Sequence, residues 1–328
     1  MPDLFTLPDL PLLRARVTYR MLEATTLPPY KGALLRGGFG YAFQRAACPA
    51  RCWGHSEQCR STQICPYRWI FETPHPPDVP HFHDLQDVPR PFVIEPPLDH
   101  KRAYAAGDSL EFGLILIGRG IDYLPYFLVG FEELGKAGLG RDHAKPKLER
   151  VEVLEPLRPI GRPIYQDGRL LDTGELPTLS VADLVTQAAA LPADLRLTLR
   201  TPLRLKARGA FLEQFDLPAL IQATCWRLAA LTAFHASPWQ TDYRPLVAAA
   251  HQVRLDNPQI QWVDWERTST RGAQPRPMTL GGMIGTVTLR EVPPTVALIL
   301  LIGSQIHVGK ACVFGHGWVE VSGDLRHT

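Results

Sequence analysis

Four cysteines lie between positions 48 and 65, at Cys48, Cys52, Cys59 and Cys65. Thiolates at this density suit tetrahedral coordination of one metal ion, and we expect zinc. The spacing differs from the paired Cys-x-x-Cys of common zinc ribbons, so an iron-sulfur cluster and four free thiols remain alternatives, and His55 could replace one thiolate. Because protein side chains would fill every coordination position, the sequence predicts a structural zinc and no catalytic metal.

A second group of residues able to do chemistry lies in the C-terminal segment HVGKACVFGHGWVEV. It combines three glycines with a lysine and two histidines, namely Gly309, Gly315, Gly317, Lys310, His307 and His316. Glycines let a backbone approach a phosphate closely, and their amides can form an anion-binding nest beside cationic side chains. The same residues also fit a glycine-rich hairpin with an incidental lysine.

Spacing excludes three nucleotide-related motifs. In 303–311 the glycines are one residue too far apart for a phosphate-binding loop, and Ala311 stands where a magnesium-binding hydroxyl is needed. The dinucleotide pattern that begins at Gly118 and Gly120 has Tyr123 in place of its third glycine. The signature of the zinc deaminases, His-x-Glu followed by Pro-Cys-x-x-Cys, is absent from the sequence.

Basic residues gather around the cysteine cluster, although the formal net charge of the chain is only +2. From position 31 to 68 the basic side chains are Lys31, Arg36, Arg45, Arg51, Arg60 and Arg68, and the only acid is Glu57. A local positive patch of this kind, more than the net charge, is what a nucleic-acid partner would require.

The composition is that of an ordinary globular protein, with 45% hydrophobic and 21% charged residues, and its 31 prolines favour short strands and turns. No apolar run is long enough to span a bilayer, and the first residues lack the features of a secretory signal. We therefore expect a cytoplasmic protein without a membrane partner. Six cysteines in such a chain fit reduced thiols or metal ligands better than a disulfide framework.

Strict alternation of apolar and polar residues predicts a strand at 12–21 with one buried and one basic side. The basic side carries Arg14, Arg16 and Arg20. The segment 195–206 repeats this pattern, with Arg196, Arg200, Arg204 and Lys206 opposite its leucines. The two strands therefore look like counterparts in two similar halves of the chain.

Further elements follow these two strands in a similar order. The first half continues with a helix at 31–47, a strand at 109–117, a helix that begins near Asp122 and a strand at 148–156. The second half continues with a helix from about Asp216, strands at 261–265 and 283–292, a helix at 293–306 and a last strand that ends near 321. Two βαββαβ units in tandem predict an α+β protein made of two ferredoxin-like, RRM-like domains, with the glycine-rich loop at the C-terminal end.

Proline-rich stretches at 72–90 and 156–192 are predicted to be loop or linker. The predicted domains are therefore 1–160, with a Cys-rich insertion at 48–72, and 190–328.

Several segments together resemble the CRISPR-associated RAMP endoribonucleases, the enzymes that cut precursor CRISPR RNA within its repeats. The resemblance rests on VDWERTSTR at 263–271, LGGMIGTVTL at 280–289 and HVGKACVFGHG at 307–317. It extends to YKGALLRGGFGYAF at 30–43, GRGIDYLPY at 118–126 and TPLRLKARG at 201–209. The Cys-rich insertion and the proline-rich stretches are less typical of this family.

The resemblance implies that two ferredoxin-like domains form a basic cleft for repeat RNA and that the cut needs no metal. A ribose 2′-hydroxyl would attack the neighbouring phosphate, and mature crRNA with 2′,3′-cyclic phosphate and 5′-hydroxyl ends would result. Repeat RNA is thus the expected partner, with other CRISPR effector subunits and a second copy of the chain as further partners. A non-catalytic RAMP subunit that binds crRNA in an effector complex, and a zinc-stapled RNA-binding module outside CRISPR, are the alternative functions.

The expected chemistry needs a base, an acid and a cation that stabilises the phosphorane. Relatives often place a histidine on the first helix, but this helix has none. Tyr41 is instead predicted to position the 2′-hydroxyl or to act as base, while Arg36 or Lys31 stabilises the phosphate charge. His307 and His55 are the remaining candidates for acid-base work.

Basic side chains of the two alternating strands, the first helix and the glycine-rich loop are predicted to bind RNA. The predicted RNA-binding residues are Arg14, Arg16, Arg45, Arg200, Arg204, Lys206, Gly309, Lys310, Gly315, His316 and Gly317.

Overall fold

The computed structural model describes residues 8–49, 52, 65–73, 82, 85, 87–171, 174–207, 209–264, 266–269, 276–279 and 281–323. These residues form two compact units. The N-terminal unit comprises Leu10–Leu179 and Ala230–Ser237. The C-terminal unit comprises Ser180–Ala229 and the described residues from Pro238 on, together with the short segment before Leu10.

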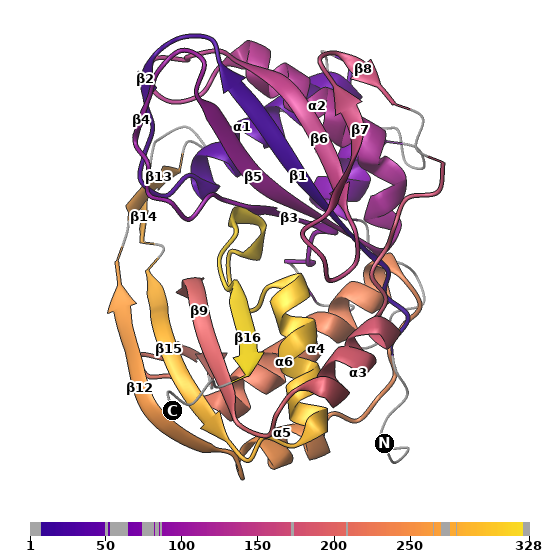
Figure 1. Cartoon of the computed structure of the whole chain (residues 1–328), viewed down its shortest axis with the longest axis vertical. Coiled ribbons are helices and arrows are strands. Elements are labelled where there is room, and N and C mark those ends of the chain that lie inside the picture. Colours follow the sequence, from indigo (N-terminus) through magenta and orange to yellow (C-terminus); the bar gives the residue numbers. More distant parts are fainter. Residues whose placement is uncertain are drawn as a thin grey trace. The chain divides into compact units, whose positions relative to one another are not determined.

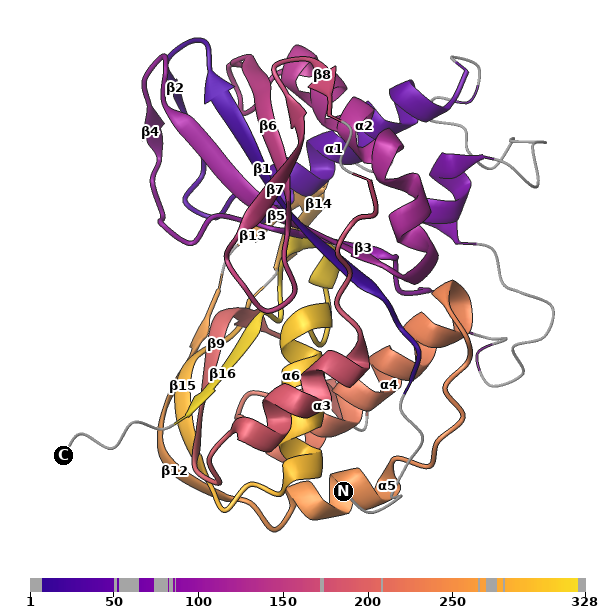
Figure 2. The same ribbon diagram turned by 45° about the vertical axis from the view of Figure 1, so that its right-hand side comes forward.

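An antiparallel sheet in the order β3-β5-β1-β6-β7-β8 forms the N-terminal unit. Its strands are β1 (Leu12–Met21), β3 (Phe92–Glu95), β5 (Ser109–Ile117), β6 (Pro146–Leu154), β7 (Gly161–Gln166) and β8 (Arg169–Leu170). Helices α1 (Gly32–Ala47) and α2 (Leu124–Ala137) cover one face of this sheet (Figure 1, Figure 2). The order β1, α1, β3, β5, α2, β6 along the chain is that of a ferredoxin-like fold.

Shorter elements complete this unit. They are the paired strands β2 (Thr25–Thr26) and β4 (Ala103–Tyr104), the π-helical turn η3 (Arg68–Glu72) and the 3₁₀ turn η5 (Gly118–Tyr123) that leads into α2.

Strand β1 lies between β5 and β6, and its alternation places one side in the core. The buried side carries Leu13, Ala15, Val17, Tyr19 and Met21, as the sequence predicts. Six phenylalanines from α1, η3, β3 and α2 continue this core, namely Phe39, Phe43, Phe71, Phe92, Phe127 and Phe131. The Phe39 ring is fully buried among the other five, and its centroid lies 4.6 Å from that of Phe131.

The C-terminal unit repeats the same order of elements around an antiparallel sheet with the order β12-β15-β9-β16. Its strands are β9 (Leu195–Leu203), β12 (Arg254–Val263), β15 (Gly282–Arg290) and β16 (Val319–Gly323). Its helices are α3 (Val181–Ala190), α5 (Arg244–Ala250), α6 (Pro294–Ile306) and α4 (Leu217–His235), whose residues from Ala230 on belong to the N-terminal unit. Two small hairpins pair β10 (Lys206–Ala207) with β11 (Ala210–Phe211), and β13 (Glu266–Ser269) with β14 (Arg276–Thr279).

The predicted linker at 156–192 is an error, because this stretch contains regular structure. Strands β7 and β8 extend the first sheet from β6, and α3 follows directly. The Ser180 hydroxyl accepts a hydrogen bond from the Asp183 amide while the Asp183 carboxylate accepts one from the Ser180 amide, and this capping box starts α3. The first boundary between the two units lies between Leu179 and Ser180, inside the stretch 156–192 that separates the predicted domains, and the chain returns to the N-terminal unit at Ala230–Ser237.

Helix α4 is the one described helix that is long and apolar enough to cross a membrane, although no membrane-spanning segment is expected from the sequence. Of its most apolar 18-residue window, 67% is buried inside the protein, as in the core helix of a globular protein.

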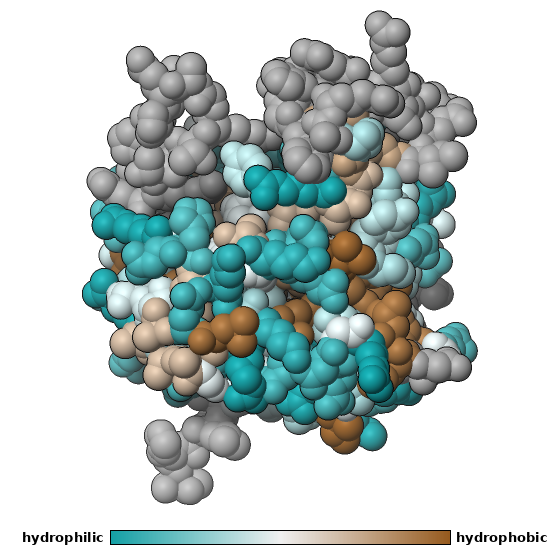
Figure 3. Space-filling view, turned by 90° about the horizontal axis from the view of Figure 1, so that it is seen from above, coloured by the Kyte–Doolittle hydropathy of each residue, from teal (hydrophilic) through white to brown (hydrophobic). Residues whose placement is uncertain are grey.

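The outer surface seen from above is largely hydrophilic, with smaller apolar patches between the polar side chains (Figure 3).

Candidate functional site

Two arginines on the polar side of β1 are paired with carboxylates of the same sheet, one on β3, beyond the neighbouring strand β5, and one on the adjacent strand β6. Arg14 Nη2 donates hydrogen bonds to both carboxylate oxygens of Glu95, at 2.9 and 2.8 Å. Gly113 makes room for this carboxylate, because a Cβ there would lie 2.4 Å from Glu95 Oε2. Arg16 lies across from Glu152 on β6, and their charged groups are 3.6 Å apart. Arg14 and Arg16 therefore form ion pairs within the first sheet, which the alternation of β1 alone does not reveal, and their contact with RNA stays a prediction.

Of the predicted site residues on and beside helix α1, Tyr41 and Arg45 are exposed to solvent and the others lie further inside the protein. Tyr41 is 57% exposed, and Arg45 is exposed one turn later, on the side away from the buried stripe of Leu35, Phe39 and Phe43. This arrangement confirms that Tyr41 and Arg45 share an outward face of the helix. A ligand that approaches this face would meet a phenol and a guanidinium together.

Lys31 immediately precedes α1 and is fully buried. Its Nζ lies 3.6 Å from Asp99 Oδ1 and 5.8 Å from the ring centroid of Tyr104. Burial lowers the pKa of the Lys31 ammonium, while the Asp99 carboxylate acts in the opposite direction. Lys31 thus neutralises Asp99 at the start of the helix, and its predicted contact with a phosphate does not fit this buried position.

Arg36 lies against aromatic rings rather than on the face of Tyr41. Its guanidinium carbon is 4.6 Å from the ring centroid of Phe71 and 5.2 Å from that of Phe92. Gly40, one turn later on α1, leaves space for the side chain, since a Cβ there would lie 2.9 Å from Arg36 Nη1. These cation–π contacts hold the guanidinium beside the aromatic core and account for glycine at position 40.

The glycine-rich segment forms a loop between α6 and β16. Several of its residues have backbone torsion angles that favour glycine. The torsion φ is positive at His307, Gly309, Ala311, Gly315 and Gly317. A Cβ at Gly309 would lie 2.5 Å from the carbonyl oxygen of Arg204, and one at Gly317 would lie 1.7 Å from that of Val308. Only glycine fits at these two positions.

Backbone hydrogen bonds tie this loop to the end of β9. The Lys310 amide donates to the Arg204 carbonyl and the Gly317 amide to the Pro202 carbonyl, both at 3.0 Å. The Gly315 amide donates to the Cys312 carbonyl at 2.8 Å within the loop. The predicted anion-binding nest is corrected here, because the amides of Lys310, Gly315 and Gly317 are already used within the protein.

A buried threonine that the sequence analysis missed also anchors the loop. The Thr201 hydroxyl donates to the Gly315 carbonyl at 2.7 Å and accepts from the Trp318 amide at 2.9 Å. Thr201 lies within β9, among its alternating leucines and arginines. Nothing in the sequence indicates that its hydroxyl forms hydrogen bonds with a segment more than 100 residues later in the chain.

Both histidines of the loop are fully buried. Nδ1 of His307 lies 2.9 Å from the His316 carbonyl oxygen, and the His307 ring packs beside Trp318 with the centroids 5.7 Å apart. Neither ring reaches solvent in this arrangement. His307 and His316 therefore pack inside the loop and help to hold it in place. Such buried rings do not fit the predicted acid-base role of His307 or the predicted contact of His316 with RNA.

The stability of the protein is expected to depend on pH through His316. Burial, with smaller contributions from His307 and Arg204, lowers the pKa of His316 from 6.5 to about 4. Between pH 7 and 5 the unfolded chain takes up a proton that folded His316 does not, so the free energy of unfolding should fall by about 2 kcal/mol at pH 5. Denaturant titrations at a series of pH values measure this slope.

The matched control for this prediction is exposed His251. His316→Gln should flatten the pH dependence and His251→Gln should leave it unchanged. An equal slope in both variants and the unaltered protein would contradict the assignment.

A surface of cations around one aromatic ring lies beside the loop in the C-terminal unit. The Arg204 guanidinium carbon is 4.0 Å from the ring centroid of Phe211, and Lys206 Nζ is 4.9 Å from it. Phe211 is 37% exposed. Lys310 is also exposed, and the hydrogen bond from its amide to the Arg204 carbonyl places it next to Arg204. Cations and an exposed ring together suit contact with RNA phosphates and bases. The three cations are among the RNA-binding residues predicted from the sequence, whereas Phe211 is not.

Arg200, further back on β9, forms an exposed ion pair with Glu320 at 3.4 Å. Exposed pairs of this kind stabilise a protein by at most about 1 kcal/mol, so Arg200 can exchange Glu320 for a phosphate at little cost.

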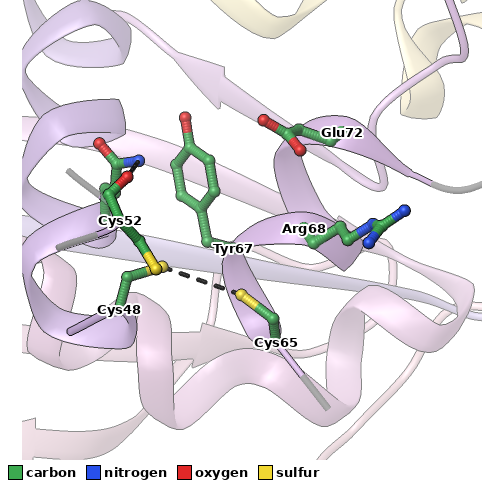
Figure 4. A pocket seen from close by; sticks show the side chains of 7 residues that line it. Cys48, Cys52, Cys65, Tyr67, Arg68 and Glu72 are labelled. Carbon is green, nitrogen blue, oxygen red and sulfur yellow. Dashed lines mark hydrogen bonds between the residues drawn. The ribbon is translucent and has the colours of Figure 1, made fainter. Parts of the chain in front are cut away.

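Three of the four predicted metal ligands, Cys48, Cys52 and Cys65, lie within the described residues and line one pocket (Figure 4). Cys59 and the substitute ligand His55 lie outside the described residues. Within the described part of the chain, no three or more His, Cys, Asp or Glu side chains are grouped closely enough to hold a metal ion. The predicted zinc is thus not shown.

Comparisons with known proteins match both units. Residues 10–176 match the family model AF_1859_N, an N-terminal domain, and residues 197–319 match the model of the CRISPR-associated endoribonuclease Cas6. An uncharacterized protein of Archaeoglobus fulgidus is 23% identical over 314 residues, which cover 94% of this chain and 96% of that protein.

Solved structures share the fold at low sequence identity. A chain of a partial Cas6-RT-Cas1–Cas2 complex superposes with a TM-score of 0.59 and 15% identity over 98% of this chain, which spans only 47% of that longer chain. A Cas6 product complex gives a TM-score of 0.54 at 13% identity, covering 94% of this chain and 99% of that chain. Cas6 of Thermus thermophilus gives 0.53 at 13% identity, covering 95% and 98%.

Two ferredoxin-like units in tandem, with a glycine-rich loop before the last strand, form the fold that this chain shares with these Cas6 structures. Residues 10–176, half of the chain, thus belong to the AF_1859_N family, and residues 197–319 carry the domain of the CRISPR-associated endoribonuclease Cas6.

Proposed function

We propose that this enzyme cuts CRISPR precursor RNA within its repeats by metal-independent attack of a ribose 2′-hydroxyl. The observation that carries the proposal is the glycine-rich loop with exposed Lys310 beside Arg204, Lys206 and Phe211, all within the segment that matches the Cas6 family model. The 2′ oxygen would form a bond to phosphorus while the bond to the 5′ oxygen breaks. A base would take the 2′ proton, and an acid would protonate the leaving 5′ oxygen.

Of the four predicted catalytic side chains, Tyr41 has the position that best suits contact with RNA. Lys31 and His307 are fully buried, and Arg36 lies against Phe71 and Phe92. Tyr41 is exposed beside Arg45, which could draw a phosphate toward the phenol. We therefore assign Tyr41 the task of positioning or deprotonating the 2′-hydroxyl, with Arg45 binding the phosphate.

The direct test incubates the purified protein with its host's labelled repeat RNA in excess EDTA. We expect one site-specific cut, and no cut when the nucleotide before the scissile phosphate carries a 2′-deoxyribose. Tight binding without cutting would overturn the catalytic proposal in favour of a non-catalytic crRNA-binding subunit. Cutting of the deoxy repeat would overturn attack by the 2′-hydroxyl.

Tyr41→Phe removes one hydroxyl and keeps the ring. If the phenol takes part in proton transfer, the single-turnover rate should fall by about 100-fold or more, while RNA affinity changes little. Tyr126→Phe is the matched control, because Tyr126 on α2 is also exposed and its ring packs near Phe43. A normal rate for Tyr41→Phe would remove Tyr41 from the proposed mechanism.

Repeat RNA is the partner that the exposed cations favour. Similarity to one chain of a Cas6-RT-Cas1–Cas2 complex extends the proposal to association with other CRISPR proteins, which co-purification from the host would test. Light scattering of the purified chain, with and without RNA, decides between a monomer and the expected homodimer.

A further inference from the structure

The β10–β11 hairpin has one buried side and one side that faces solvent. Lys206 and Phe211 lie directly across the hairpin from each other, so their side chains share one side of it. Both residues are exposed, whereas Leu205, whose side chain alternates to the other side, is buried. The Arg204 guanidinium carbon lies 4.0 Å from the Phe211 ring centroid and therefore joins the outward side. The outward side of the hairpin thus carries one aromatic ring and two cations.

Backbone hydrogen bonds place a third cation at the opposite edge of the same segment. The Leu212 amide donates to the Leu205 carbonyl, and the Lys310 amide donates to the Arg204 carbonyl, both at 3.0 Å. Carbonyl groups of consecutive residues in an extended chain point in opposite directions, so 204–206 lies between β11 and the glycine-rich loop. Two strand spacings then separate β11 from the loop by about 10 Å. We call the four outward side chains of this region the hairpin surface, namely Arg204, Lys206, Phe211 and Lys310.

The two lysines of the hairpin surface differ from other exposed lysines in their charge environment. Exposed Lys101, Lys136 and Lys147 each form an ion pair with a carboxylate at 2.6 to 2.7 Å. Lys206 and Lys310 form no ion pair with a carboxylate among the residues that the structure describes. An ammonium group of this kind can bind a phosphate without first giving up an acidic partner. Both lysines are therefore suited to hold the backbone of a nucleic acid.

The exposed ring of Phe211 favours an unpaired base over a base pair. In a double helix each base is stacked between its neighbours, so its face is not open to a protein side chain. An unpaired base offers that face, and stacking on an aromatic ring strengthens binding for every base type. A ring beside cations that hold the backbone is the arrangement by which proteins bind single-stranded nucleic acid.

We propose that the hairpin surface binds one unpaired nucleotide of the repeat RNA, with its base stacked on Phe211 and the adjoining phosphates against Lys206 and Lys310. Arg204 keeps the ring in position through its cation–π contact. The inference rests on the proposed function, because it takes repeat RNA as the ligand. It makes Phe211 a specificity-determining residue that distinguishes a single-stranded part of the repeat from a stem, and it gives Phe211 no part in the cleavage chemistry.

The first test compares paired and unpaired RNA under conditions in which no RNA is cut. Labelled repeat RNA with a 2′-deoxyribose before the scissile phosphate is titrated by fluorescence anisotropy, alone and annealed to its full complement. Phe211→Leu should weaken binding of the repeat about tenfold and change binding of the annealed duplex by less than about twofold. Phe211→Tyr should restore the affinity, because it keeps the ring.

Trp226→Leu is the matched control for loss of an exposed ring. Trp226 lies on α4 in the same unit, and its exposed fraction of 38% is close to the 37% of Phe211. This variant should bind both forms of the RNA with unchanged affinity. Unchanged affinity of Phe211→Leu for the repeat, or an equal loss for repeat and duplex, would overturn the proposal.

Abasic nucleotides distinguish a stacked base from a merely structural role of the ring. One base at a time is removed from the uncuttable repeat, and at one unpaired position the unaltered chain should lose about tenfold in affinity. Phe211→Leu should bind that abasic RNA as well as it binds the intact repeat, because the contact is already lost. If the abasic RNA instead binds the variant more weakly by a further factor of ten, the ring supports the hairpin and does not stack on a base.

The stacking proposal and the cleavage proposal fail in different experiments. A chain that binds the uncuttable repeat through Phe211 but never cuts the normal repeat would contradict the proposed cleavage and leave the stacking intact. Normal cutting together with unchanged repeat affinity in Phe211→Leu would do the reverse. A chain that binds no repeat RNA at all would contradict both.

Discussion

Gly317→Ala should abolish RNA cleavage and lower the stability of the C-terminal unit by more than 2 kcal/mol. The added Cβ would lie 1.7 Å from the Val308 carbonyl oxygen, so the backbone of the glycine-rich loop must move. That movement breaks the hydrogen bond from the Gly317 amide to Pro202 and displaces Lys310, whose amide is bonded to Arg204. Repeat-RNA affinity, single-turnover cleavage and thermal unfolding measure the three consequences.

Gly168→Ala provides the control for backbone torsion alone. Gly168 has a φ of 89°, close to the 67° of Gly317, but no atom lies within 4 Å of a Cβ added there. The free energy of unfolding of this variant should fall only by the cost of placing alanine in a left-handed conformation, roughly 1–2 kcal/mol, and the variant should cut RNA normally. Equal losses in the two variants would mean that torsion, and not the close approach of Val308, makes the loop glycine-rich.

Phe39→Ala should destabilise the N-terminal unit by about 3–5 kcal/mol. The ring is fully buried at the centre of the phenylalanine core, with centroids 4.6 Å from Phe131 and 5.3 Å from Phe127. Its loss leaves a cavity between α1 and α2 and loosens Phe71 and Phe92, on which Arg36 rests. Denaturant unfolding followed by circular dichroism measures the change.

Val129→Ala is the control for this truncation, because Val129 is 45% exposed on α2. Its free energy of unfolding should change by less than about 0.5 kcal/mol. A comparable loss in both variants would show that the aromatic cluster is not the core that holds α1 against the sheet.

Local periodicity allowed the main elements to be predicted from the sequence. The alternation at 12–21 and 195–206 and the apolar stripe at 31–47 depend on neighbours within a few residues, and β1, β9 and α1 confirm them. Strands β7 and β8 were missed because their residues alternate weakly, and their place in the sheet comes from pairing with β6.

The environment of the site residues could be predicted far less well, because it depends on distant partners. Arg14 and Glu95 are 81 residues apart, and Thr201 and Gly315 are 114 apart. The buried positions of Lys31 and His307 follow from packing that no motif encodes. Residue type thus indicated which groups could do chemistry, but contacts between remote segments decide which of them face a ligand.

The carboxylates along the first sheet also influence how RNA binding responds to ionic strength. Arg14 and Arg16 face the largely buried carboxylates of Glu95 and Glu152, so each gains less from a phosphate than an arginine in an exposed ion pair, and each releases few condensed counterions when RNA arrives. The salt dependence of affinity should therefore report mainly on cations without such a partner, with a slope of roughly −0.7 for each single-strand phosphate neutralised. On the proposed function, the acidic residues of a ferredoxin-like sheet would limit non-specific attraction to polyanions and leave the contact with RNA to the exposed cations around Phe211.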